Sequence, residues 1–170
     1  MRAETEMLDF APSHERGAQN LIRHFSRLVL AVVFSVTLTL QAPAETVAAT
    51  ARKWGLIGRW SVDCARPAGR DKSAVLAYEI AASDQVVHRR DFGDTQDENP
   101  VVSAEVSGDG VLNLRVFFPK FKQTREYGLV KQSDGTMQTT YNRGPDEQYS
   151  IKDSKFTANG NPTPALHKCR

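Results

Sequence analysis

The feature that most constrains the fold is an alternation of apolar and polar residues that recurs along the chain after position 55. The clearest example places Leu112, Leu114, Val116 and Phe118 at every second position. Side chains of a β-strand point to opposite faces with a period of two, so this pattern predicts a half-buried strand. About eight such strands, at spacings of about 8 to 12 residues, are predicted at 56–64, 74–81, 85–92, 101–107, 111–118, 123–131, 136–143 and in a short hairpin of 149–152 with 155–158.

Turn-forming residues separate these segments, as in Ser-Gly-Asp-Gly at 107–110 and Asn-Gly at 159–160. Helical periodicity is nearly absent from this part of the chain, and no β-α-β unit is evident, so the sheet should be antiparallel. Such strands must bury one apolar face, and curling into a barrel also removes exposed sheet edges. We therefore expect an all-β domain over 56–170, an antiparallel β-barrel of about eight strands, preceded by a tether at 45–55.

The first 44 residues have the features of a leader with a secretory signal peptide. Arg23 and Arg27 precede the apolar run 28–40, and Ala-Pro-Ala at 42–44 supplies the small residues that a signal peptidase recognises. A membrane-spanning helix needs about 20 apolar residues, and this run is shorter. We expect export to the periplasm or the medium, with cleavage after Ala44 and with membrane contact only through this segment before cleavage.

Two cysteines, Cys64 and Cys169, lie near the two ends of the part that follows the leader. In an oxidising compartment, an even number of cysteines in this arrangement is most simply explained by one disulfide. The sequence has no Cys-x-x-Cys motif for redox chemistry, and the cysteines and histidines do not have the spacing of a zinc site. A structural disulfide is therefore the prediction.

Charge and motif content bound the functional classes. The 22 Lys and Arg residues nearly balance the 20 Asp and Glu residues, which disfavours a nucleic-acid-binding protein. Only His88 and His167 follow the leader, and no nucleophile elbow, zinc-protease motif or phosphate-binding loop accompanies them. We expect no catalytic centre, cofactor or metal site. The acidic segment 91–99 has ligand types suited to calcium, but we interpret it as a solvated hairpin loop, which Pro100 favours.

Aromatic side chains are the candidates for ligand or partner contacts. Those singled out are Tyr78, Phe117, Phe121, Tyr127 and Tyr141. The tyrosines could line the interior of a small barrel, which is either filled by side chains or holds one small ligand. An exposed phenylalanine beside the cations of 117–125 could contact an apolar ligand, a partner protein or an anionic surface. The alternative interpretation is structural: the strand ends here, and the cations are solvated.

Short motifs at the two ends of the expected barrel carry a family resemblance. Gly58-x-Trp60-x-x-Asp63-Cys64 resembles the G-x-W opening of calycins, the lipocalin and avidin-like barrels. Together with the C-terminal pattern Asn-Gly-x-x-Thr-Pro-x-Leu-x-x-Cys at 159–169, it is similar to a group of small exported bacterial proteins of unknown function. The resemblance implies a lipocalin-like barrel closed by Cys64 and Cys169, in which Trp60 plugs one end and Gly58 permits close approach of a neighbouring chain. It implies no ligand or active site.

The resulting functional hypothesis is an exported binding module of the bacterial envelope, for a small apolar ligand or an envelope protein. The alternative is a protein-interaction or inhibitor module without a ligand cavity, which would use loops such as 91–100. A hydrolase ranks last, because the sequence offers no catalytic constellation.

Overall fold

The computed structural model describes residues 45–70 and 74–170. The leader and signal segment predicted at 1–44 lie outside the described residues. The elements, in chain order, are α1 (Val47–Trp54), β1 (Gly58–Ser61), β2 (Val75–Ile80), η1 (Ala82–Asp84), β3 (Val86–Asp91), β4 (Gln96–Val106), β5 (Leu112–Phe118), η2 (Pro119–Phe121), β6 (Gln123–Lys131), β7 (Met137–Arg143), β8 (Tyr149–Lys152), β9 (Lys155–Phe156) and β10 (His167–Cys169).

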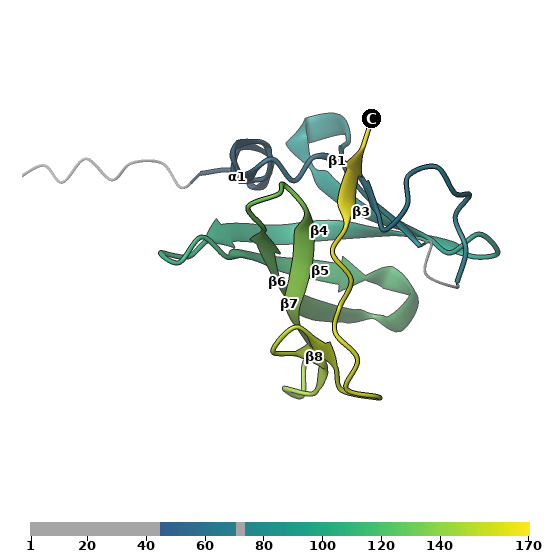
Figure 1. Ribbon diagram of the computed structural model, residues 1–170. Coiled ribbons are helices and arrows are strands. Elements are labelled where there is room, and N and C mark those ends of the chain that lie inside the picture. The colour runs from purple at the N-terminus through teal and green to yellow at the C-terminus, as the bar shows by residue number, and fades with distance from the viewer. Residues whose placement is uncertain (1–44, 71–73) are drawn as a thin grey trace, which may run out of the picture. The chain divides into compact units, whose positions relative to one another are not determined.

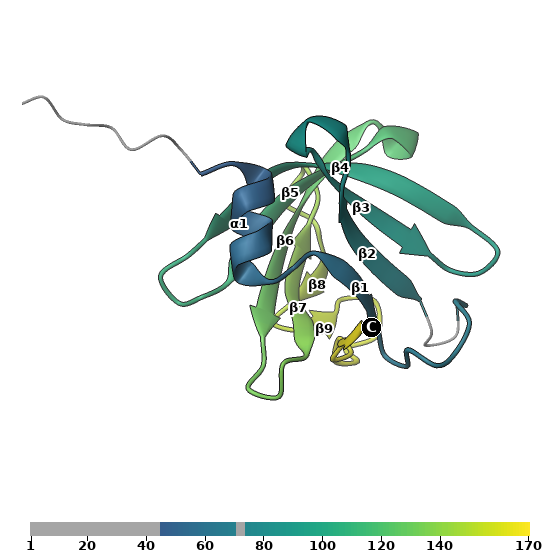
Figure 2. The ribbon, with the colours of Figure 1, turned by 90° about the horizontal axis from the view of Figure 1, so that it is seen from above.

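The strands form one antiparallel sheet in the order β10-β1-β2-β3-β4-β5-β6-β7-β8-β9. Each strand from β1 to β9 pairs with its neighbour in the chain, and β10 returns to pair with β1. The sheet curls, so that β1–β3 and β5–β7 diverge from the region of β4 (Figure 2). The prediction of an all-β, antiparallel, barrel-like fold is confirmed, but the described residues form ten strands rather than about eight.

The C-terminal segment connects the two halves of the curled sheet. Leu166 and Met137 exchange two backbone hydrogen bonds, of 2.9 and 2.8 Å, which join this segment to β7. The next residues form β10 and pair with β1. Figure 1 shows this segment, in yellow, running past β7 towards β1. One stretch of chain therefore contacts strands that lie far apart in the sheet order.

Strand β4 is where the sheet changes direction. Its first part, 96–100, pairs with β3, whereas 101–106 pairs with β5, and the register shifts between Val101 and Ser103. Pro100 lies at the change of partner, where a residue without an N–H can be accommodated in a strand. The interpretation of 91–99 as a solvated loop is therefore wrong for 96–99, which belong to β4.

The segment 45–55 is not a tether but contains the helix α1. The side chain of Thr46 caps its first turn by accepting a hydrogen bond from the Ala49 amide, and Gly55, with φ of 85°, ends it in the left-handed conformation. An isolated helix of eight residues is marginal in water, so packing must stabilise this one. Ala48 and Ala51 provide that packing, since both are fully buried in the core.

A single hydrophobic core lies on the inner face of the curled sheet. The alternation in β5 is reproduced, because Leu112, Leu114, Val116 and Phe118 are all at most 1% exposed. Other members come from every part of the described chain, including Leu56, Trp60, Tyr78, Val86, Val101, Tyr127, Leu129, Met137 and Leu166.

Candidate functional site

The candidate site is a cavity of about 280 Å³ on the inner side of the sheet. Leu76 of β2 and His88 of β3 contribute from one half, and Tyr127 of β6 and Ile151 of β8 contribute from the other. Leu166, from the C-terminal segment that joins the halves, completes this set. The cavity therefore exists because the curl brings together strands that are distant in the sequence.

Other hollows in the described structure are lined mostly by polar and charged side chains. One of them, of about 650 Å³, lies between α1 and the end of β4, and its lining includes Glu45, Lys53 and Glu105. Ligand sites are concave and mostly apolar, with a few placed polar groups. The inner cavity matches that description better, because aliphatic and aromatic side chains form most of its wall.

His88 is the most unusual group in the cavity wall. It is 1% exposed, and its ring stacks on that of Tyr78 with centroids 4.5 Å apart and planes 6° apart. Neither ring nitrogen has a hydrogen-bond partner among the described residues. Burial, followed by the nearby positive charge of Arg90, lowers the pKa of His88 from 6.5 to about 3. The imidazole is therefore neutral, with one donor and one acceptor nitrogen.

Arg90, which also lines the cavity, has its charge compensated by Asp97. The two residues are directly opposite each other in β3 and β4, and Arg90 Nε donates to Asp97 Oδ1 at 2.8 Å. Asn99 Nδ2 donates to the same oxygen at 2.7 Å. Burial alone would raise the pKa of Asp97, but these hydrogen bonds and the Arg90 charge lower it below its ordinary value. The pair is therefore ionised and contributes no net charge.

The same guanidinium packs against aromatic rings. Arg90 Cζ lies 4.6 Å from the centroid of the Phe118 ring and 5.6 Å from that of Phe92. Such contacts favour a cation over the ring face. Burial lowers the pKa of Arg90, but the hydrogen bond and charge of Asp97 more than offset this, so its pKa is raised. Arg90 is thus held in place on three sides, as a fixed part of the wall.

Two polar side chains on the other half of the cavity, Asn142 and Thr163, have hydrogen-bond partners. Asn142 Oδ1 accepts a hydrogen bond of 2.6 Å from Arg125 Nε. Thr163 Oγ1 donates to the Thr139 carbonyl at 2.7 Å. Burial raises the pKa of Tyr127, so its hydroxyl stays protonated. The arrangement is suited to binding, because the wall is mostly apolar and includes the imidazole of His88, whose buried nitrogens have no partner among the described residues.

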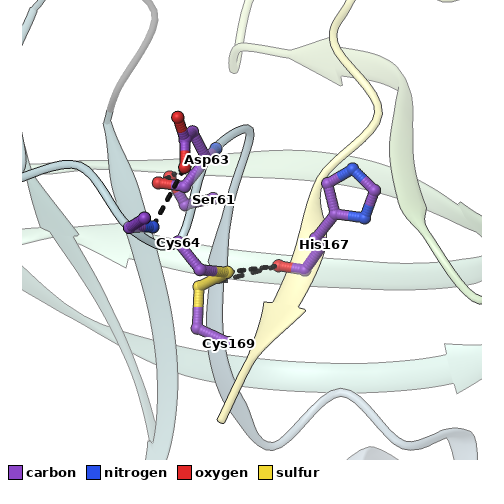
Figure 3. The surroundings of a disulfide bond; sticks show 6 residues. Ser61, Asp63, Cys64, His167 and Cys169 are labelled. Carbon is purple, nitrogen blue, oxygen red and sulfur yellow. Dashed lines mark hydrogen bonds between the residues drawn. A yellow bond between two sulfur atoms is a disulfide. The ribbon is translucent and has the colours of Figure 1, made fainter.

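The disulfide predicted between Cys64 and Cys169 is present, with the two Cα atoms 5.4 Å apart. Figure 3 shows Cys64, in the segment after β1, meeting Cys169 at the end of β10. The His167 carbonyl oxygen lies 3.8 Å from Cys64 Sγ. Ser61 and Asp63 order the approach to Cys64, since the Asp63 amide donates to Ser61 Oγ at 3.4 Å. A disulfide of this kind indicates an oxidising environment.

Gly58 and Trp60 lie in β1, beside the returning C-terminal strand. Trp60 is 1% exposed, and its indole N–H donates to the Leu56 carbonyl at 2.7 Å. A Cβ on Gly58, whose φ is 135°, would meet Lys168 Cε at 2.8 Å. Trp60 is thus a core residue and Gly58 a point of close approach, while the role of the ring as a plug stays a prediction.

The five aromatic contact candidates do not form one site. Tyr127 lines the inner cavity, and Tyr78 is buried behind His88. Tyr141 donates from its hydroxyl to Asn113 Oδ1 at 2.8 Å and lines a different hollow. Phe117 is half-buried, and Phe121, in η2, is 56% exposed. The sequence did not single out the His88–Arg90–Asp97 arrangement, which the structure places in or beside the cavity wall.

A signal for that arrangement is present in the sequence. Val86, His88 and Arg90 have the two-residue spacing of one strand face, and Val86 is apolar and fully buried. This spacing places His88 and Arg90 on the inner face. The partner Asp97 could not be identified in the same way, because its strand was interpreted as a loop.

Two further findings bear on the site. In the described parts of the chain, no group of three or more His, Cys, Asp or Glu side chains is arranged to hold a metal ion. None of the described helices is long and apolar enough to span a membrane.

No protein-family model, curated protein or solved structure matches this chain.

Proposed function

We propose that this protein is an exported, lipocalin-like binding module of the bacterial envelope, periplasmic or secreted, that holds a small apolar ligand. The observation that carries the proposal is the inner cavity of about 280 Å³ with its mostly apolar wall. Pockets for drug-sized ligands span about 300–1,000 Å³. The ligand is therefore small, at the lower end of that range.

The structural features that surround the cavity support a container rather than a catalyst. The disulfide and the Leu166–Met137 hydrogen bonds hold the C-terminal segment across the two halves of the sheet. The two charged side chains of the wall are each paired with a carboxylate, Arg90 with Asp97 and Arg70 with Asp94. His88 has no carboxylate as a hydrogen-bonding partner among the described residues, so it lacks the orienting group typical of a general base.

Export is supported by two independent features. The apolar run 28–40, followed by Ala-Pro-Ala, is typical of a signal peptide. The Cys64–Cys169 disulfide is of the kind that persists outside the reducing cytosol. The G-x-W opening at Gly58 and Trp60 supports the lipocalin-like assignment, because Trp60 is buried at the start of the sheet.

A second candidate is a protein-interaction or inhibitor module that does not use the cavity. Exposed apolar side chains favour it, since Phe121 and Val102 are each 56% exposed and Val106 is 44% exposed. A partner of this kind should be retained in stoichiometric amount when the protein is pulled down from an envelope extract. Loss of that partner in Phe121→Ser or Val102→Ser, and not in Leu76→Trp, would favour this function over ligand binding.

Toluene binding to the oxidised full chain tests the first proposal. Apolar cavities bind small aromatic hydrocarbons, so toluene should shift the NMR signals of cavity residues such as Leu76 and Ile151 in a saturable manner. Leu76→Trp, which adds volume inside the cavity, should abolish this shift and leave the fold intact. Saturable binding that is equal in both proteins, or absent from both, would refute the proposed cavity function.

A further inference from the structure

The strongest unexplained feature of the cavity is the unsatisfied hydrogen-bonding capacity of His88. Buried polar groups in proteins are nearly always hydrogen-bonded, and an exception calls for an explanation. The two ring nitrogens have no partner in residues 45–70 and 74–170, although the side chain lines the cavity. A molecule in the cavity is therefore adjacent to a buried side chain whose two nitrogens make no hydrogen bond within the described residues.

The electrostatics of the wall restrict the charge of such a molecule. The groups around His88 are Tyr78 and Tyr127, whose pKa values are raised by burial, and the Arg90–Asp97 pair. Two cations line the cavity, Arg90 and Arg70, and each is paired with a carboxylate, Asp97 and Asp94. An anion near either cation would also approach a carboxylate, and a cation would meet a guanidinium. Burial of an ionised ligand without its own counter-charge is costly. A neutral ligand avoids this cost.

The size of the cavity restricts the rest of the molecule. Each molecule in liquid water occupies about 30 Å³, so the cavity volume of 280 Å³ equals that of roughly nine water molecules. A single substituted ring or a short aliphatic chain has that size. Apolar neighbours such as Leu76, Phe92 and Ile151 favour a hydrocarbon body.

We infer that the cavity selects a small neutral molecule with a hydroxyl group, an alcohol or a phenol, and that this hydroxyl hydrogen-bonds to His88. A hydroxyl is both a donor and an acceptor, so it can pair with either nitrogen of a neutral imidazole. The inference rests on the proposed binding function and specifies its ligand class. Benzoate, toluene and p-cresol are matched probes, because they share one ring and differ in the substituent that would face His88.

The experiment measures the affinities of the three probes for the oxidised full chain at pH 7 by NMR titration. A typical net hydrogen bond corresponds to about fivefold in affinity, so p-cresol should bind about fivefold more tightly than toluene. Benzoate should bind more weakly than both. In His88→Phe, the p-cresol preference should disappear while toluene binding stays within about twofold of wild type, because only the hydrogen bond is lost.

Two controls keep the result interpretable. His167→Phe removes the exposed histidine of β10, outside the cavity, and should leave the p-cresol preference unchanged. In the wild-type protein, p-cresol but not toluene should shift the ¹⁵N resonance of a His88 ring nitrogen, a readout that requires no variant.

The outcomes separate this inference from the function on which it rests. If toluene and p-cresol bind equally well and the His88 nitrogens do not respond, the hydroxyl selectivity is refuted and the cavity function stands. If benzoate binds most tightly, an anionic ligand replaces the neutral one. If no probe binds to wild type, or if Leu76→Trp binds all of them normally, the cavity function itself fails.

Discussion

Replacement of His88 by phenylalanine should remove most of the acid sensitivity of this protein between pH 7 and pH 5. In the folded state the pKa of His88 is about 3, against 6.5 for the ordinary side chain. Between these two values the unfolded chain binds a proton that the folded chain does not bind. Stability therefore rises with pH in this window, and it falls as the pH is lowered from 6.5 towards 3.

The loss of stability on acidification follows from the distance between the pH and the pKa of the unfolded histidine. A pH of 5 lies about 1.5 units below the pKa of the histidine in the unfolded chain, and each unit corresponds to about 1.4 kcal/mol. Proton uptake by the unfolded chain should thus lower the free energy of unfolding by about 2 kcal/mol relative to pH 7. In His88→Phe this contribution is absent. The variant should also be at least as stable as wild type at pH 7, because it no longer buries two unpartnered nitrogens.

Urea unfolding at pH 7 and pH 5, followed by tryptophan fluorescence, measures the effect. Other titrating groups contribute equally to wild type and to His88→Phe. The difference between the two proteins in how the free energy of unfolding changes with pH therefore isolates the contribution of His88. His167→Gln serves as the matched control and should retain the wild-type slope. Equal slopes in wild type and His88→Phe would refute the conclusion that His88 is buried in its neutral form.

Three further experiments test other parts of the fold. The disulfide closes a sequence separation of 105 residues, so Cys64→Ser with Cys169→Ser should lower stability by about 4.7 kcal/mol in the loop-entropy model. Unfolding midpoints that are equal with and without reductant would contradict this. Trp60→Ala should cost about 3–5 kcal/mol, measured by circular dichroism melting, because the ring is 1% exposed. A Cβ on Gly128 would lie 2.2 Å from Cε1 of Tyr141, so Gly128→Ala should cost about 1–3 kcal/mol. That cost should shrink in the Tyr141→Ala background, and purely additive effects would argue against the contact.

Several strands were predicted accurately from the sequence. β6 and β8 begin and end at the predicted residues, and β5 differs by one residue at its start. In β5 the alternation follows directly from burial of one face, whereas β6 contains three consecutive buried residues and is delimited by the turns on either side. β10 gave no such signal, because His167, Lys168 and Cys169 do not alternate and the strand is defined by its pairing with β1.

The helix and the first half of β4 were missed for different physical reasons. α1 is only eight residues long, and its buried side chains, those of Ala48, Thr50 and Ala51, are small, so no run of large apolar residues marks it in the sequence. Its Thr46 and Gly55 caps were the available signals. The acidic residues of β4 resemble a solvated loop in sequence, but Asp97 and Glu98 are paired across the sheet with Arg90 and Arg89. Cross-strand ion pairs are not visible until the register is known.

The cavity could not be predicted from the sequence, because it depends on the curl of the sheet. Its residues come from β2, β3, β6, β7, β8, β9, the C-terminal segment and the segments that follow β1 and β3. Local patterns place Tyr127 and His88 on inner faces but do not specify how far apart the two halves of the sheet lie. That separation decides whether the interior is filled by side chains or leaves room for a ligand.

Native mass spectrometry of the protein purified from the cells that produce it tests the binding account most directly. The account predicts a chain that lacks the leader, contains one intact disulfide and retains a small neutral molecule that is released on denaturation. Protein with Leu76→Trp, purified in parallel, should show the same processed chain without that molecule. Wild-type protein that carries only its polypeptide mass, or carries the same molecule as the Leu76→Trp variant, would contradict the account.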